Sequence, residues 1–105
     1  MKSTFTIMLN RADEAEYLSR LDAAGVPEHL HHGLVRYLVY RIQPGSFLMA
    51  CLENDLCVAM RLADETSRDE LFRIVTFLYG DVPGIAWGSP NKVAAWLART
   101  EDIDV

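Results

Sequence analysis

The chain has 105 residues and half of them are apolar, which is enough for one compact hydrophobic core but not for two. Its 15 acidic residues outnumber its 10 basic residues, and the formal net charge is -5. This balance disfavours a general nucleic-acid binder, because binding to phosphate backbones requires clustered Lys and Arg. The chain is also less acidic and more apolar than we expect of a DNA mimic.

The sequence contains no segment that we expect to enter a membrane. Its longest apolar stretch, Phe47 to Leu52, is far too short to span a bilayer. Residues 1–9 lack the apolar core and the small-residue cleavage site of a signal peptide. We therefore expect a cytoplasmic protein.

Residues 2–9 alternate Thr4, Thr6 and Met8 with Phe5, Ile7 and Leu9, which is typical of a half-buried β-strand. A single strand needs a partner, and no second strand pattern follows it. The segment is expected to be either an extended arm laid across the helices or an edge strand that pairs with another subunit as a homodimer.

The rest of the sequence predicts helices, over residues 12–24, 27–42, 47–63, 67–80 and 90–99. Proline is tolerated in the first helical turn and Ser, Thr and Asp favour the position before it, so Ser89 followed by Pro90 is a clear helix start. Ser46 and Thr66 or Ser67 are the expected caps of two other helices. The predicted fold is a compact, mostly all-α bundle of about five short helices in one domain, with the N-terminal strand or arm as an exception and a frayed acidic tail at residues 101–105.

The predicted helix at 47–63 is apolar on nearly every side, which is typical of a central helix. Three polar residues interrupt it: Glu53, Asn54 and Asp55. Because buried polar groups need partners, we favour a structural network that also involves Arg36, Arg61, Trp87 and Ser89. A catalytic carboxylate pair is the alternative, but adjacent helical residues diverge by about 100° and do not converge on one substrate atom.

His29 and His32 lie three residues apart on one predicted helical face and could share a metal ion. A zinc site requires three or four ligands, and the two cysteines belong to another predicted helix. Solvated histidines are the favoured interpretation, and no metal or cofactor is predicted. Cys51 and Cys57 point about 120° apart on a helix, so we expect buried free thiols and no disulfide.

Tyr40 lies on the side of its predicted helix away from the apolar stripe and close to Arg36. Tyr and Arg are enriched at binding hot spots. We therefore predict an exposed Tyr40 and a candidate interaction surface made of Tyr40, His29, His32 and Arg36.

Several short motifs follow one another in a fixed order: His-Gly-Leu-Val-Arg-Tyr-Leu at 32–38, Pro-Gly-Ser-Phe-Leu at 44–48, Leu-Glu-Asn-Asp-Leu at 52–56, Arg-Leu-Ala-Asp-Glu at 61–65 and Trp-Gly-Ser-Pro at 87–90. In this order the chain resembles a family of short, uncharacterised proteins of tailed bacteriophages and prophages. The resemblance covers about two thirds of the chain, and it divides the domain into a variable N-terminal arm and first helix (1–26) and a helical core (27–100). It implies a phage or bacterial origin and carries over no catalytic residue.

Two functions are compatible with these observations. The favoured one is a non-enzymatic interaction module that binds a host or phage protein, such as a host defence protein. It rests on the absence of recognisable catalytic motifs in the sequence. The alternative is a small hydrolase or metal-dependent enzyme that uses Glu53, Asp55 and a histidine. A nucleic-acid regulator using Arg36 and Arg41 is disfavoured by the net charge.

Overall fold

A computed structural model of the protein describes residues 14–99. Its elements are α2 (Glu14–Ala24), the 3-10 turn η2 (Glu28–Leu30), α3 (His31–Tyr40), α4 (Ser46–Leu52), α5 (Leu56–Leu62), α6 (Glu65–Asp69), α7 (Leu71–Asp81) and α8 (Pro90–Ala98). Every regular element in this part of the chain is helical, which confirms the all-α prediction. The strand predicted at 2–9 and the tail at 101–105 fall outside the described residues.

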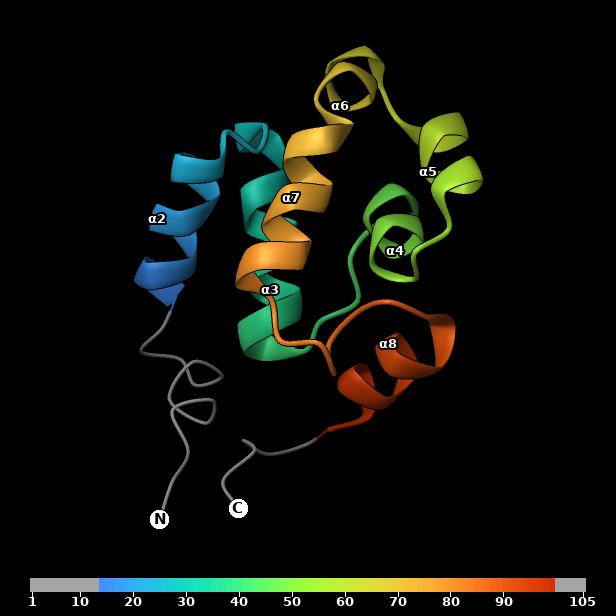
Figure 1. Cartoon of the computed structure of the whole chain (residues 1–105). Helices are drawn as coiled ribbons and strands as arrows, with labels where there is room; N and C mark the ends of the chain where they lie inside the picture. The colour runs from blue at the N-terminus through green and yellow to red at the C-terminus, as the bar shows by residue number, and fades with distance from the viewer. Residues whose placement is uncertain (1–13, 100–105) are drawn as a thin grey trace.

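The helices form one bundle in which α2 packs against both α3 and α7 (Figure 1). The next two helices, α4 and α5, pack against each other, and α8 lies across the lower end of the bundle in Figure 1. None of the helices within residues 14–99 combines the length and apolar character needed to cross a bilayer.

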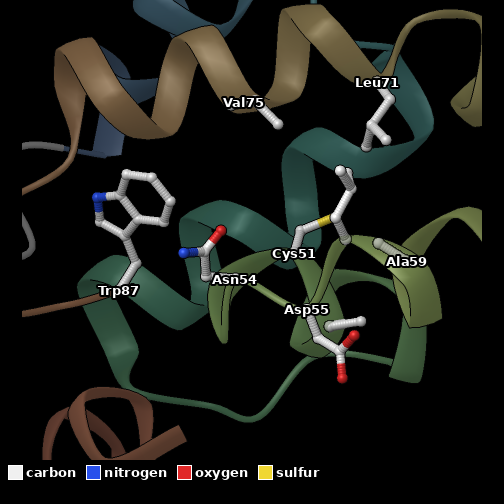
Figure 2. Close-up of a pocket in the computed structure, with 9 residues that line it drawn as sticks. Cys51, Asn54, Asp55, Ala59, Leu71, Val75 and Trp87 are labelled. Carbon is white, nitrogen blue, oxygen red and sulfur yellow. The ribbon is translucent and has the colours of Figure 1, made fainter. Parts of the chain in front are cut away.

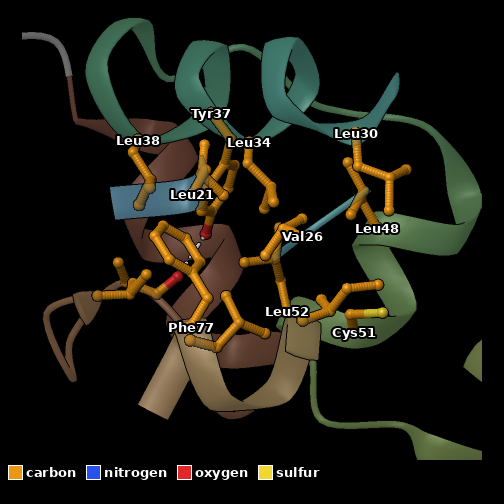
Figure 3. Packing of buried hydrophobic residues seen from close by; sticks show 14 of the residues in the cluster. Leu21, Val26, Leu30, Leu34, Tyr37, Leu38, Leu48, Cys51, Leu52 and Phe77 are labelled. Carbon is orange, nitrogen blue, oxygen red and sulfur yellow. Dashed lines mark hydrogen bonds between the residues drawn. The ribbon is translucent and has the colours of Figure 1, made fainter. Parts of the chain in front are cut away.

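One hydrophobic core joins these helices (Figure 3). Leu21 of α2, Leu34 of α3, Leu52 of α4 and Phe77 of α7 are fully buried within it. Each such side chain stabilises the fold by roughly 1.5–3 kcal/mol relative to an exposed position. Because Leu21 shares this core, the first helix packs with the helices of residues 27–100.

The sequence leaves open whether the predicted helix at 47–63 continues through its three polar residues, and in the structure it breaks there. α4 ends at Leu52, Asn54 adopts a left-handed backbone conformation with φ 64°, and Asp55 accepts a hydrogen bond of 3.2 Å from the Val58 amide to cap α5. Asn tolerates the left-handed region and Asp is a favoured N-cap, so these residues end one helix and start the next. The break turns α5 outward and leaves Ala59 as its buried residue.

The predicted helix at 67–80 also divides. Asp64, rather than Thr66 or Ser67, caps α6 by accepting a hydrogen bond of 2.6 Å from the Ser67 amide. α7 then begins at Leu71 and passes through Gly80 to Asp81. The side chain of Ser67 is buried instead of forming a cap.

Of the two other helix caps predicted from the sequence, the one at Ser89 is confirmed and the one at Ser46 is wrong. Ser89 accepts a hydrogen bond of 3.2 Å from the Lys92 amide, and Pro90 occupies the first turn of α8, which confirms that predicted helix start. Ser46 does not cap α4 as predicted, because Gly45 takes the N-cap position and Ser46 is the first helical residue. The helix predicted over residues 27–42 begins as the 3-10 turn η2 and continues as α3, which ends at Tyr40.

Candidate functional site

The helix break at Asn54 forms one wall of a small, mostly apolar pocket (Figure 2). The other walls come from α4, α5, α7 and the loop before α8, and the lining residues are Ala50, Cys51, Asn54, Asp55, Leu56, Ala59, Leu71, Val75 and Trp87. The Gly88 amide donates a hydrogen bond of 2.7 Å to the Leu52 carbonyl, which ties the Trp87 loop to the end of α4. The free space is only about 30 Å³, so the pocket is a shallow depression.

The residues of the predicted polar network are only partly brought together. Asn54, Asp55 and Trp87 line the pocket of Figure 2. Asp55 and Ser89 instead cap the helices that follow them. Arg36 lines a different pocket, between α2 and α3, and Arg61 is exposed on α5. Asn54 and Asp55 at the break therefore serve mainly to end α4 and to start α5.

Glu53 and Asp55 line a further pocket of about 330 Å³ beside residues 43–46. None of the histidines lines this pocket; His29, His31 and His32 lie on η2 and α3. The structure thus does not place a histidine beside the two carboxylates that the hydrolase hypothesis requires. Asp55 is in addition engaged as the cap of α5.

His29 contacts the start of α6. Its Nε2 atom lies 3.1 Å from a carboxylate oxygen of Asp64 and 3.3 Å from the hydroxyl oxygen of Ser67. The serine and the aspartate meet the same ring nitrogen, whereas a catalytic triad uses the two nitrogens separately. Hydrogen bonds from the amide and hydroxyl groups of Ser67, together with the nearby His29, hold the pKa of Asp64 below its ordinary value.

The other histidines lie apart from this contact. His31 Nε2 is 2.7 Å from the Val26 carbonyl oxygen, and His32 faces the pocket between α2 and α3. Within residues 14–99 no group of three or more metal-ligating His, Cys, Asp or Glu side chains is found.

The thiols of Cys51 and Cys57 differ in their exposure to solvent. Cys51 is buried against the core, and burial raises its pKa to about 12. Cys57 is exposed. Both are free, as predicted, but the expectation of burial is wrong for Cys57, because the break at Asn54 turns α5 toward solvent.

Three of the four residues of the predicted interaction surface converge on the pocket between α2 and α3. Tyr40, His32 and Arg36 line it together with Glu14 and three apolar residues, Leu18, Val35 and Ile42. Its free volume is about 330 Å³. The prediction of an exposed Tyr40 is wrong: the ring is half-buried, and its hydroxyl donates a hydrogen bond of 2.7 Å to Glu14. His29 lies outside this pocket.

The outer face of α7 carries exposed apolar side chains, and two of them, Val75 and Phe72, are residues that the sequence pattern places on the core side or leaves as a possible member of it. Phe72 is 61% exposed, Val75 41% and Tyr79 85%, whereas Phe77 is fully buried. Apolar residues occur on both faces of α7, so periodicity could not separate its inner face from its outer face. Leu56 of α5, also exposed, lines the same pocket as Val75.

Comparisons with known protein families, curated proteins and solved structures find no match to this chain.

Proposed function

We propose that the protein is a phage-type accessory protein of the bacterial cytoplasm, a non-enzymatic module that binds a host or phage protein at the pocket between α2 and α3. The observation that carries the proposal is the convergence of Tyr40, Arg36 and His32 around apolar walls. Pockets with apolar walls and a few converging polar groups are the usual form of a recognition site. The resemblance of the sequence to short phage proteins supports the proposed origin.

The chemistry of the pocket indicates what the partner presents. Leu18 and Ile42 are exposed at the pocket and can bury an apolar side chain of the partner. The exposed Arg36 makes no ion pair with another residue in the described range 14–99. Its guanidinium can bind a carboxylate bidentately. The partner segment is therefore expected to combine an apolar anchor with an adjacent acidic group.

The oligomeric role of residues 2–9 remains a prediction from their alternating pattern. The pocket wall includes Glu14, the first residue that the structure describes. Partner binding and any role of the segment can be separated by testing variants of the pocket in the full-length chain.

The test is photo-crosslinking in bacterial cells followed by affinity measurement. A photoreactive residue at Ile42 is compared with one at Thr66, an exposed residue of α6. The protein captured from Ile42 is then purified and titrated against the wild type, Arg36→Ala and the matched control Arg61→Ala. We expect Arg36→Ala to weaken binding by about tenfold or more, as for a hot-spot residue, and the control to leave it unchanged.

Equal capture at Ile42 and Thr66 would contradict the proposal. So would an Arg36→Ala variant that binds the captured protein as tightly as the wild type does. Far-UV circular dichroism of each variant checks that the helices are retained.

A further inference from the structure

The outer face of α7 is an apolar surface that the bundle leaves uncovered. Its most exposed members are two aromatic side chains, Phe72 and Tyr79, which lie two helical turns apart. Large exposed aromatic side chains in a row are typical of protein contact surfaces. This face is separate from the pocket between α2 and α3, so the inference does not depend on the function proposed above.

The distribution of charge on α7 indicates which kind of protein could bind to its outer face. Phe72, Val75, Thr76, Tyr79 and Gly80 carry no charge, in a chain whose formal net charge is -5. Arg73 at the edge of this face is paired with Glu70, so a strongly acidic or basic partner would find little uncompensated charge here. Two copies of the same face can meet without placing like charges opposite each other, which favours a second copy as the occupant.

The face is also complementary to itself. In a twofold arrangement of antiparallel helices centred near Thr76, residues four positions before and after the centre lie opposite each other. Phe72 of one copy then faces Gly80 of the other. A Cβ atom built on Gly80 would meet no atom within 4 Å, so the surface there is open and can receive the exposed ring.

The same register places Tyr79 opposite Arg73. Arg73 forms an ion pair with Glu70, and its guanidinium carbon lies 4.9 Å from the centre of the Phe72 ring. A guanidinium group already held over one aromatic ring can contact a second ring from the other copy. The contact would be made twice, because the arrangement is symmetric.

The area available fits a weak dimer. An aromatic side chain offers roughly 150–250 Å², so Phe72 and Tyr79, exposed by 61% and 85%, present together about 300 Å² per copy. Both copies supply about 600 Å², which is about half of the ~1,200 Å² at the lower end of stable interfaces. Val75, Thr76 and the flanking Leu56 add to this area.

We propose that a second copy of this chain docks on the outer face of α7, with the two α7 helices antiparallel about a twofold axis near Thr76. The dimer would be weak and concentration-dependent. This dimer would form through α7 of the bundle and not through the strand predicted at residues 2–9.

The first test is sedimentation velocity of the full-length protein over a wide range of concentrations. We expect a reversible monomer–dimer equilibrium whose dissociation constant rises about tenfold or more in Tyr79→Ser and in Phe72→Ser. Both side chains are exposed, so these substitutions leave the core intact. Ile42→Ser is the matched control, because it removes an exposed apolar side chain at another surface and is expected to leave the equilibrium unchanged.

The second test fixes the register by disulfide trapping in a Cys57→Ser background. A Thr76→Cys variant should form a covalent dimer under mild oxidation, whereas Thr66→Cys on α6 should not. An equimolar mixture of Phe72→Cys and Gly80→Cys should crosslink more efficiently than either variant alone.

A protein that stays monomeric at every concentration would overturn the proposal. A dimer that is insensitive to both serine substitutions would overturn it as well, and loss of that dimer on deletion of residues 2–9 would assign assembly to the N-terminal segment. Crosslinking of Phe72→Cys to itself in preference to Gly80→Cys would exclude the antiparallel register.

Discussion

The hydroxyl group of Tyr37 donates a hydrogen bond of 2.6 Å to the main-chain carbonyl of Ala86. The indole N–H of Trp96 donates in turn to the Tyr37 carbonyl, at 3.0 Å. Burial raises the pKa of the Tyr37 hydroxyl above its ordinary value, with a smaller contribution from Glu53, so the group remains a donor. These two bonds join α3 to the loop before α8 and to α8 itself, although the partners lie far apart in the sequence.

Replacing Tyr37 with Phe should test this connection. The ring is retained, but the Ala86 carbonyl, in the buried interior, loses its donor. We expect a loss of about 1–3 kcal/mol in the free energy of unfolding, measured by urea denaturation. Tyr79→Phe removes a hydroxyl from an exposed ring and should change the value by less than about 0.5 kcal/mol. Equal effects of the two substitutions would mean that the Ala86 bond is not important for stability.

Asn54 provides a second prediction, because its φ of 64° is costly for most residues with a side chain. Asn54→Ala should destabilise the fold by about 1 kcal/mol, since Ala adopts the left-handed region less readily than Asn. Asn54→Gly should be neutral or nearly so, because glycine reaches this conformation at no steric cost. Both variants lose the side chain, so the difference between them in thermal or chemical denaturation isolates the backbone effect. Two equally destabilised variants would show instead that the amide group of Asn54 matters.

The cap of α6 predicts a pH dependence. The folded-state pKa of Asp64 lies below its ordinary value, mainly because of the Ser67 hydrogen bonds, so ionised Asp64 favours the folded state. Its contribution is complete above the unfolded-state pKa of about 3.9 and is lost as the pH falls through the lower folded-state value. The wild type should therefore be more stable than Asp64→Asn at neutral pH, and this difference should shrink on acidification below about pH 4.

Urea denaturation at a series of pH values measures this difference. Asp69→Asn is the control, because it removes an exposed carboxylate from the same helix without touching the cap. A difference between the wild type and Asp64→Asn that stays constant across the acidic range would show that ionisation of Asp64 does not stabilise α6.

Parts of the candidate site could be predicted from the sequence. Tyr40, Arg36 and His32 belong to one helix and its start, so their convergence follows from helical geometry. The burial of Tyr40 could not be predicted, since it depends on Glu14 from another helix. The same holds for the Figure 2 pocket, whose lining comes from three separate segments of the chain: residues 50–59, α7 and the loop before α8.

The sequence by itself determined the all-α class, the approximate positions of the helices and the start of α8. These features depend on local signals, such as proline in the first turn, Ser89 before it and apolar periodicity, and local signals act over only a few residues. Local signals at Asn54 and Asp55 also break the segment at 47–63. Tertiary packing decided that Phe72 and Tyr79 of α7 face outward while Phe77 faces inward. When a helix is apolar all round, its inner face is chosen by the neighbours it packs against, and those neighbours are brought together only in the folded chain.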